Sequence, residues 1–338
     1  MLLSLDQIKD ITRGCARIEE QDQTFVLMRF TEKQAQAYRD IGNEDFYNKT
    51  FATAGVRLAF RTDSSKIAFD YRFTRCSSRQ FAYFDVYLDG ALTGHFGTQG
   101  LECMTGHIEL PIPAATEKVE IHFPWSHGVR LSHVEIDDNS TVTGLHRPHT
   151  MICFGDSITH GYDAEMTSQS YASIVMRRLD LDGMNQGVGG YTFHHESLDP
   201  ALFEGRTQPD IITIAYGTND WSGKTNENFT RDIDEYFVRL RELYPDVPVL
   251  VITPVFRASH YIPTKAGTFE YAREYLANAA KKHPNTYVLD GDKLVPHLYD
   301  CFRDVRLHPN DAGFVTYGAS VADAVAEILG IRPKSFFI

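Results

Sequence analysis

The sequence lacks the features of an exported, disulfide-stabilised or membrane-spanning protein. Its five cysteines are odd in number and widely spaced, and no C-x-x-C pair occurs among them. This pattern favours a reducing compartment over a disulfide framework. The first ten residues contain neither a basic segment nor a long apolar core, and no apolar run elsewhere is long enough to span a bilayer. We therefore expect a cytoplasmic protein with no membrane partner.

An excess of positive charge is also missing, as is any spacing typical of metal ligands. The formal net charge is -12, and a negative surface repels phosphate backbones, so nucleic acid is not an expected partner. His194 and His195 are adjacent, so their side chains point apart, and no H-E-x-x-H motif occurs. We expect no metal and no other cofactor.

The first part of the chain reads as a β domain. At 338 residues, of which 43% are apolar, the chain exceeds the size at which a single core stops growing, so two domains are expected. Between residues 57 and 136, short runs alternate between apolar and polar residues, and turn signals such as Asp89-Gly90 separate them. Helical periodicity is missing there. We expect an all-β, jelly-roll-like sandwich domain at residues 1–145.

From residue 150 onward, apolar strand-like runs alternate with helical patterns. Residues 169–179 and 228–244 read as helices, and the alternation indicates a parallel sheet between helices. The two patterns are separated by the polar segment 140–149. We expect an α/β domain at residues 150–338.

A serine stands where one of these strands ends. The block Phe154-Gly155-Asp156-Ser157-Ile158-Thr159-His160-Gly161 follows the apolar run from Met151 and precedes the helix at 169–179. A strand-turn-helix presents the hydroxyl of Ser157 at the carboxyl edge of a sheet, where open α/β domains usually carry their site. The alternative is a serine that only caps a helix or closes a turn.

Three further segments repeat the pattern of a strand end followed by a polar loop. They are the glycine-rich loop Asn185-Gln186-Gly187-Val188-Gly189-Gly190-Tyr191-Thr192, the segment Gly217-Thr218-Asn219-Asp220, and Asp304-Val305-Arg306-Leu307-His308-Pro309-Asn310-Asp311 before the last helix. A serine hydroxyl needs an adjacent base at neutral pH, and a histidine can take and return its proton. Backbone N–H groups and an amide side chain can stabilise an oxyanion, although Asn219 could instead cap the next helix. The set fits an acyl transfer.

The four blocks in this order resemble the SGNH (GDSL-type) hydrolases over roughly residues 150 to 330. The resemblance implies a flavodoxin-like three-layer α/β/α fold, with Ser157 as the nucleophile and His308 as its general base. It also implies an oxyanion hole made of the N–H groups of Ser157 and Gly190 with the Asn219 amide.

One position departs from the family. The usual last block is Asp-x-x-His, which would place the acid at Val305, whereas this chain has Asp304 one residue earlier. Asp304 would orient His308 as the third group of a triad does. Alternatively, a main-chain carbonyl orients the ring, since some two-domain carbohydrate esterases of this family run on a Ser-His dyad.

A β-sandwich before such a domain resembles carbohydrate esterases that remove acetyl groups from plant polysaccharides. The resemblance implies a small-molecule or oligosaccharide ester as the substrate, and Trp221 could stack on a sugar ring, unless it packs in the core. A lipid or thioester acylhydrolase and an inactive carbohydrate-binding protein are the alternatives. The oligomeric state is left open.

Overall fold

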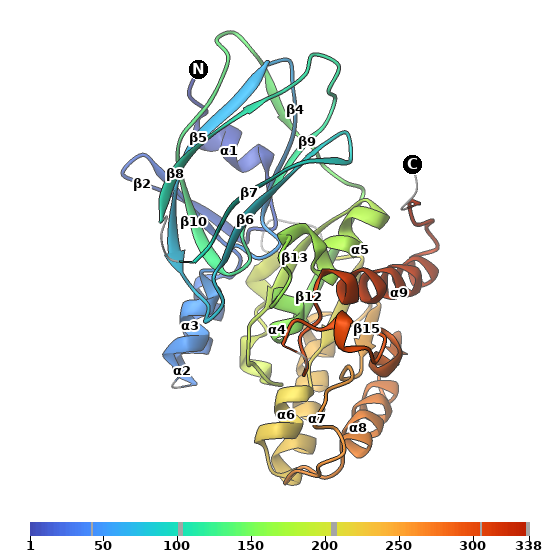
Figure 1. Cartoon of the computed structure of the whole chain (residues 1–338). Helices are drawn as coiled ribbons and strands as arrows, with labels where there is room; N and C mark the ends of the chain where they lie inside the picture. The colour runs from blue at the N-terminus through green and yellow to red at the C-terminus, as the bar shows by residue number, and fades with distance from the viewer. Residues whose placement is uncertain (42, 101–103, 204–207, 305, 336–338) are drawn as a thin grey trace.

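The chain forms a β-rich N-terminal part and an α/β C-terminal part, which the computed structural model shows one above the other in Figure 1. The structure describes residues 1–41, 43–100, 104–203, 208–304 and 306–335.

Two antiparallel sheets build most of the N-terminal part. The first has the order β1-β4-β9-β6-β7 with β11 beside β4, and the second has the order β2-β3-β10-β5-β8. Their buried faces share one core, to which Phe60 and Ile121 of the first sheet and Phe69 and Leu131 of the second contribute. The prediction of a β-rich N-terminal domain is confirmed, whereas its jelly-roll order stays a prediction. The strands are β1 (Thr12–Arg13), β2 (Arg17–Gln21), β3 (Thr24–Met28), β4 (Arg57–Thr62), β5 (Lys66–Arg75), β6 (Phe81–Leu88), β7 (Ala91–Gln99), β8 (Thr105–Pro111), β9 (Val119–His122), β10 (His127–Ile136) and β11 (Val142–Gly144).

The turn expected at Asp89-Gly90 joins β6 to β7. Both residues have positive φ, 50° and 86°, as a two-residue type I′ hairpin requires. Asp89 also accepts hydrogen bonds from the backbone N–H groups of Glu117 and Lys118. The turn therefore sets the register of the hairpin and ties it to the neighbouring loop.

The C-terminal part is built on a parallel sheet of five strands with the order β13-β12-β14-β15-β16. This is the flavodoxin-like order, in which the connections change direction beside the first strand of the sheet. The strands are β12 (His149–Gly155), β13 (Leu181–Gly187), β14 (Ile211–Ala215), β15 (Val249–Ile252) and β16 (Thr286–Leu289). The α-helices are α4 (Ser157–His160), α5 (Tyr171–Leu179), α6 (Thr218–Gly223), α7 (Asn226–Leu243), α8 (Phe269–Lys281) and α9 (Asp311–Leu329). Short 3-10 turns are η1 (Thr167–Gln169), η2 (His195–Ser197), η3 (Pro200–Phe203), η4 (Gly291–Lys293) and η5 (Tyr299–Cys301).

Helices cover both faces of this sheet because successive strand residues point to opposite sides. In β12, Ile152 and Phe154 join the core made with α7 and α8, whereas Met151 and Cys153 join the core made with α5 and α9. The part of a strand that is buried on both faces must be apolar, as Met151–Phe154 of β12 are. The expected layering of helix, sheet and helix is observed.

Helix α9 is the one described helix that is long and apolar enough to cross a membrane by length and composition, which the sequence analysis did not anticipate. Its apolar residues have another explanation, because α9 packs against α5 and the sheet. Tyr317 of α9, for example, stacks on Tyr171 with 4.4 Å between the ring centres. A core helix of this kind needs no membrane to bury its apolar face.

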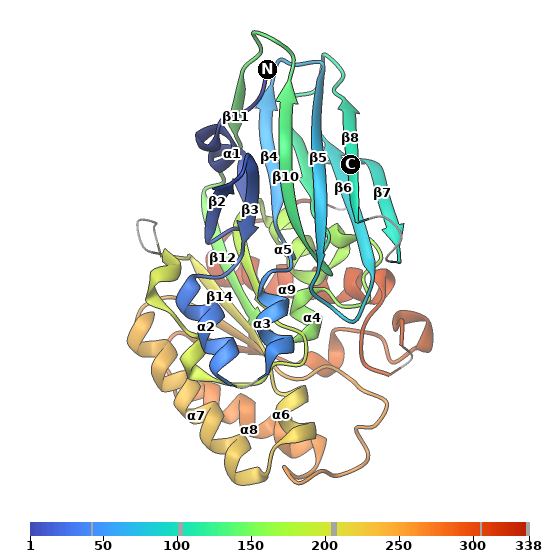
Figure 2. The same ribbon diagram turned by 90° about the vertical axis from the view of Figure 1, so that its left-hand side faces the viewer.

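Three helices in the first fifty residues were not expected. They are α1 (Leu5–Ile11), α2 (Glu32–Asp40) and α3 (Glu44–Thr50). Phe30 and Tyr38 belong to the same core as the α7 face of the parallel sheet, and Figure 2 shows α2 and α3 lying against the C-terminal part. An all-β domain at residues 1–145 is therefore too simple, although the strands β11 and β12 do end and begin on either side of residues 145–148. The domain limits stay a prediction.

Candidate active site

The serine turn contains a close approach that only glycine allows. A Cβ atom on Gly155 would lie 1.9 Å from Thr159 Oγ1. Asp156 is the N-cap of α4, and its side chain accepts a hydrogen bond from Ile158 N at 3.0 Å. Ser157 is the first residue of α4, where backbone N–H groups have no partner within the helix. The Ser157 N–H is therefore a candidate donor to a ligand at the sheet edge.

Ser157 lies next to a histidine from the far end of the chain. His308 Nε2 is 2.8 Å from Ser157 Oγ, and His308 Nδ1 is 2.7 Å from Asp304 Oδ2. Because a carboxylate can only accept, Nδ1 carries the proton in this arrangement and Nε2 is left to accept from the hydroxyl. The order carboxylate, imidazole, hydroxyl suits removal of the Ser157 proton.

Asp304 is fixed by the loop that carries His308. Its Oδ1 accepts hydrogen bonds from the backbone N–H groups of Arg306, Leu307 and His308, at 3.0, 2.9 and 3.1 Å. Burial alone would raise the pKa of Asp304, but the hydrogen bonds from His308 and Leu307 hold that pKa well below its usual value. The side chain is therefore a carboxylate at neutral pH. Val305, the position of the acid in the resembled family, lies outside the described residues.

A second carboxylate lies near the same imidazole, and the sequence analysis did not single it out. Asp163 Oδ2 is 3.7 Å from His308 Nδ1, and its side chain is 3% exposed. Arg79, from the loop between β5 and β6, donates to both oxygens of Asp163, at 2.6 and 3.2 Å. Asp163 lies just beyond the block that contains Ser157, so the sequence offered a signal for it. No sequence pattern near Arg79 indicated this contact.

The glycine-rich loop after β13 is a tight turn. Tyr191 N donates to Val188 O at 3.0 Å, and Gly190 has a φ of 83°, as expected at the third position of a type II turn. A Cβ atom on Gly189 would lie 2.6 Å from the Tyr162 ring, so this position also requires glycine. Within the described part of the chain, the Gly190 N–H has no hydrogen-bond partner. It is a candidate donor to an oxyanion.

Asn219 is the second residue of α6 and is not the cap of that helix, whose N-cap is Gly217. Its Nδ2 donates one hydrogen bond, to Tyr191 O at 3.0 Å. An amide nitrogen carries two hydrogens, so the bond to Tyr191 fixes the amide plane and leaves the second hydrogen for a ligand. The same bond connects the Asn219 loop to the glycine-rich loop.

Residues 153–314, which run from β12 through these loops into α9, match the GDSL-like lipase/acylhydrolase family. The chain carries a GDSL-type acylhydrolase domain. The predicted resemblance to the SGNH hydrolases is thereby confirmed, whereas the roles of the individual site residues stay predictions.

Solved structures of similar fold extend over nearly the whole chain. A salicylyl-acyltransferase from a tetracycline biosynthetic pathway has 23% identity and a TM-score of 0.76, with 95% of this chain and 96% of that chain covered. A putative GDSL-like lipase from Bacteroides ovatus has 19% identity and a TM-score of 0.74, with 97% and 98% covered. An acetyl xylan esterase from the rumen bacterium Butyrivibrio proteoclasticus has 14% identity and a TM-score of 0.61, with 97% of each chain covered. No curated protein sequence matches the chain. At these identities the likeness extends to the fold, a β-rich part joined to an acylhydrolase domain.

Trp221 of the acylhydrolase domain does not offer a face for stacking on a sugar. Its side chain is 1% exposed, and its indole N–H donates to Gly267 O at 3.0 Å. The ring contacts Phe269 edge to face and has the Arg257 guanidinium over it, 5.0 Å from the ring centre. The predicted substrate-binding role of Trp221 is therefore wrong, because the ring is packed in the core.

Three side chains at the site offer atoms close enough together for a metal ion. Ligand atoms of Asp163, Asp304 and His308 lie within 4.8 Å of one another. Arg79 already binds both oxygens of Asp163, and Asp304 accepts a hydrogen bond from His308 Nδ1, so a cation would have to displace both contacts. These residues fit a hydrogen-bonded triad better than a metal centre, and the absence of a metal cofactor stays a prediction.

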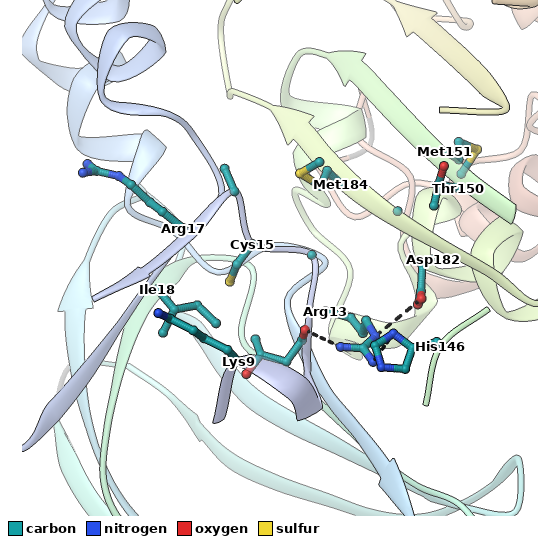
Figure 3. Close-up of a pocket in the computed structure, with 14 residues that line it drawn as sticks. Lys9, Arg13, Cys15, Arg17, Ile18, His146, Thr150, Met151, Asp182 and Met184 are labelled. Carbon is teal, nitrogen blue, oxygen red and sulfur yellow. Dashed lines mark hydrogen bonds and ion pairs between the residues drawn. The ribbon is translucent and has the colours of Figure 1, made fainter. Parts of the chain in front are cut away.

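A cavity of about 650 Å³ lies at the other end of β12, away from Ser157. Figure 3 shows its walls, which come from the segment between Lys9 and Ile18 and from the first residues of β12 and β13. Two of its charged groups pair with each other, since Arg13 lies 3.4 Å from Asp182. The cavity therefore belongs to the junction between the two parts of the chain and not to the acylhydrolase site.

Proposed function

We propose that this protein is a serine esterase that hydrolyses O-acetyl or other short acyl esters, with carbohydrate as the bearer of the ester. One observation carries the proposal: Asp304, His308 and Ser157 are joined by two hydrogen bonds of 2.7 and 2.8 Å at the carboxyl edge of the sheet of an acylhydrolase domain. A serine held in this way is activated as a nucleophile.

In the proposed reaction, Ser157 Oγ attacks the ester carbonyl while its proton passes to His308 Nε2. The charge that develops on the carbonyl oxygen is bound by the N–H groups of Ser157 and Gly190 and by the Asn219 amide. His308 then returns the proton to the leaving alcohol, which leaves an acyl group on Ser157. A water molecule, deprotonated by His308, releases the acid and restores the enzyme. Asp304 holds the imidazole in the required tautomer and stabilises its charged form.

The acetylated-carbohydrate substrate is supported by the overall architecture. The named similar structures include an acetyl xylan esterase in which the likeness covers both parts of the chain. The substrate class is thus proposed by analogy with proteins of similar fold. The jelly-roll order of the N-terminal sheets is proposed on the same ground. A cytoplasmic enzyme would meet imported small molecules or oligosaccharides rather than intact fibre.

The proposal is tested with p-nitrophenyl esters of increasing chain length. We expect turnover of the acetate, its loss by several orders of magnitude in Ser157→Ala, and trapping of one acetyl group on Ser157 by rapid quench and mass spectrometry. A fitting pocket gains roughly 1 kcal/mol or more for each methylene, so a steady rise in kcat/KM toward octanoate would indicate a lipid acylhydrolase. Equal activity in wild type and Ser157→Ala would exclude the serine-esterase mechanism. No turnover of any ester would favour an inactive carbohydrate-binding protein.

Acyl transfer is a second candidate, because the similar structure with a TM-score of 0.76 is an acyltransferase. The same acyl-enzyme would then be attacked by an alcohol instead of water. Adding a sugar or a simple alcohol to the assay separates the two functions: a transferase forms the new ester at the expense of free acetate, whereas a hydrolase releases acetate in the same amount.

A further inference from the structure

The N-terminal part of the chain binds the backbone of the glycine-rich loop with two cationic side chains. Arg29 Nη1 donates to the carbonyls of Asn185 and Gly187, at 2.6 and 3.1 Å. Lys49 Nζ donates to Gly189 O at 2.9 Å. Lys49 comes from α3, which Figure 2 shows against the acylhydrolase domain. The loop that carries a proposed oxyanion donor is therefore held from outside its own domain.

Lys49 is an unusual residue for such a contact, because its side chain is only 9% exposed. Its ammonium group forms an ion pair with Asp45 one turn earlier in α3 and lies 5.8 and 6.0 Å from the ring centres of Phe46 and Tyr162. Burying an ammonium group is costly unless its donors are used. The bond to the Gly189 carbonyl uses one of them.

The peptide that Lys49 binds is the one that carries the Gly190 N–H. The described residues contain no cis peptide bond, so the Gly189–Gly190 peptide is trans and planar. In a trans peptide, the C=O and the N–H point in opposite directions. Fixing the Gly189 oxygen therefore fixes the direction of the Gly190 N–H. A cation on the oxygen also polarises the peptide and makes its N–H a stronger donor.

The neighbouring peptide is held separately. Gly189 N donates to His160 Nδ1 at 3.3 Å, and His160 Nε2 donates to Trp125 O at 2.9 Å. Burial lowers the pKa of His160 well below its usual value, so the ring is neutral and can accept at Nδ1. Among the described residues, the one hydrogen bond to the Gly189–Gly190 peptide is that from Lys49. Gly190 itself has positive φ and gains no restraint from a side chain.

We propose that Lys49 is a positioning residue that aims the Gly190 N–H into the oxyanion hole from the opposite side of its peptide. Lys49 does not touch the substrate. The proposal rests on the proposed role of Gly190 and adds that a cation of the N-terminal part completes the site.

The test compares Lys49→Met, which removes the charge and the donors, with Lys49→Arg, which keeps both. Lys33→Met is the matched control, since Lys33 lies in the preceding helix α2 and its side chain is 70% exposed. We expect Lys49→Met to lower kcat for the acetate ester by about 10- to 100-fold with little change in KM, because a misdirected donor affects the transition state more than the bound ester. Lys49→Arg should keep most of the activity, and Lys33→Met should behave as wild type.

A second measurement distinguishes a misdirected Gly190 N–H from a general loss of active protein. A short alkyl boronic acid forms a tetrahedral adduct on Ser157, and its Ki should rise in Lys49→Met by the factor by which kcat/KM falls. Activities are expressed per titrated active site, and the melting temperature of each variant is measured. If Lys49→Met retains kcat and Ki within twofold of wild type, the proposal is overturned.

Two further outcomes are decisive. If Lys49→Met does not fold, Lys49→Leu replaces it, since leucine also lacks a donor and a charge; kcat and Ki equal to those of Lys49→Arg would then overturn the proposal. Ser157→Ala is assayed alongside. Full activity in Ser157→Ala would refute the proposed function itself, whereas an inactive Ser157→Ala with an unaffected Lys49→Met would refute only the role of Lys49.

Discussion

The two parts of the chain use polar side chains in different ways. In the acylhydrolase domain, Ser157 and Asn219 lie at helix starts just after strands, and His308 lies in the loop before α9. The N-terminal part contributes Arg29 and Lys49, which are buried and bind backbone carbonyls of the other part. Reacting groups need access to the substrate. Side chains that bind the backbone need no such access, and their hydrogen bonds are stronger where water is excluded. In the proposed function, the acylhydrolase domain carries the reacting groups, and the N-terminal part fixes their geometry.

The largest effect among the following variants is expected at the carboxylate that binds His308. Asp304→Asn keeps an oxygen for the loop N–H groups but removes the charge at Nδ1, so kcat should fall by up to about 10⁴-fold with the fold intact. Asp163→Asn is the matched control, because Asp163 lies 3.7 Å from Nδ1 and is neutralised by Arg79. The decrease in kcat of Asp163→Asn should be much smaller. Steady-state kinetics of both variants measure the difference, and near-wild-type turnover in Asp304→Asn would leave a Ser-His dyad.

The second prediction concerns the stability of the junction. Arg57 is buried and pairs with Glu120 of its own sheet, at 3.2 Å, and with Asp182 of the acylhydrolase domain, at 3.0 Å. Arg57→Met should lower the free energy of unfolding by about 3–5 kcal/mol, because it leaves buried carboxylates short of a partner. Arg61→Met, which breaks only the exposed pair with Glu117, should cost less than about 1 kcal/mol.

Urea denaturation measures both variants, and kcat of the folded Arg57→Met protein should match wild type. A large loss of kcat without a loss of stability would mean that the junction acts on the chemistry and not only on folding.

The third prediction concerns the amide donor. Asn219→Ala should lower kcat by about 10²–10³-fold, which is the typical effect of removing one preorganised oxyanion donor from an enzyme. KM should change little, because the charge on the oxygen develops only in the transition state. Rapid kinetics with p-nitrophenyl acetate measure the acylation step directly. An effect confined to KM would show that Asn219 binds the ground-state ester instead.

The smallest effect is a pH-dependent change in stability at Asp156. Burial raises the pKa of this carboxyl to about 7, against the hydrogen bond from Ile158 and the charge of His308, which lower it. The folded state therefore keeps the proton between about pH 4 and 7 while the unfolded chain loses it, so this group lowers stability as pH rises through that range.

Asp156→Asn removes that penalty and keeps an acceptor for Ile158 N. One pKa unit corresponds to about 1.4 kcal/mol, so we expect the variant to be at least that much more stable than wild type at pH 8 and equal to it below pH 4. Thermal unfolding at both pH values measures the gain. A variant that is destabilised equally at both would show that Asp156 acts only as a helix cap.

Features that depend on neighbouring residues were predictable from the sequence. The apolar run Met151–Phe154 became the centre of β12, the turn at Asp89-Gly90 was found in place, and residues 228–244 nearly coincide with α7. Helices α1 and α2 were not predicted, although each begins with a capping box, Ser4 with Gln7 and Thr31 with Gln34. Both helices are short, so their apolar periodicity is weak. These were errors of interpretation and not gaps in the sequence.

Contacts between distant residues were decided only by the tertiary structure. The sequence named Asp304 and a main-chain carbonyl as alternatives, and the loop conformation placed the Asp304 carboxylate 2.7 Å from Nδ1. Trp221 could have lain on the surface or in the core, and packing against Phe269 buried it. The bond between Lys49 and Gly189 joins residues 140 positions apart, and that between Arg79 and Asp163 joins residues 84 apart. Local patterns encode strands, turns and helices because those depend on near neighbours, whereas the contacts named here depend on how loops and distant segments pack in the folded chain.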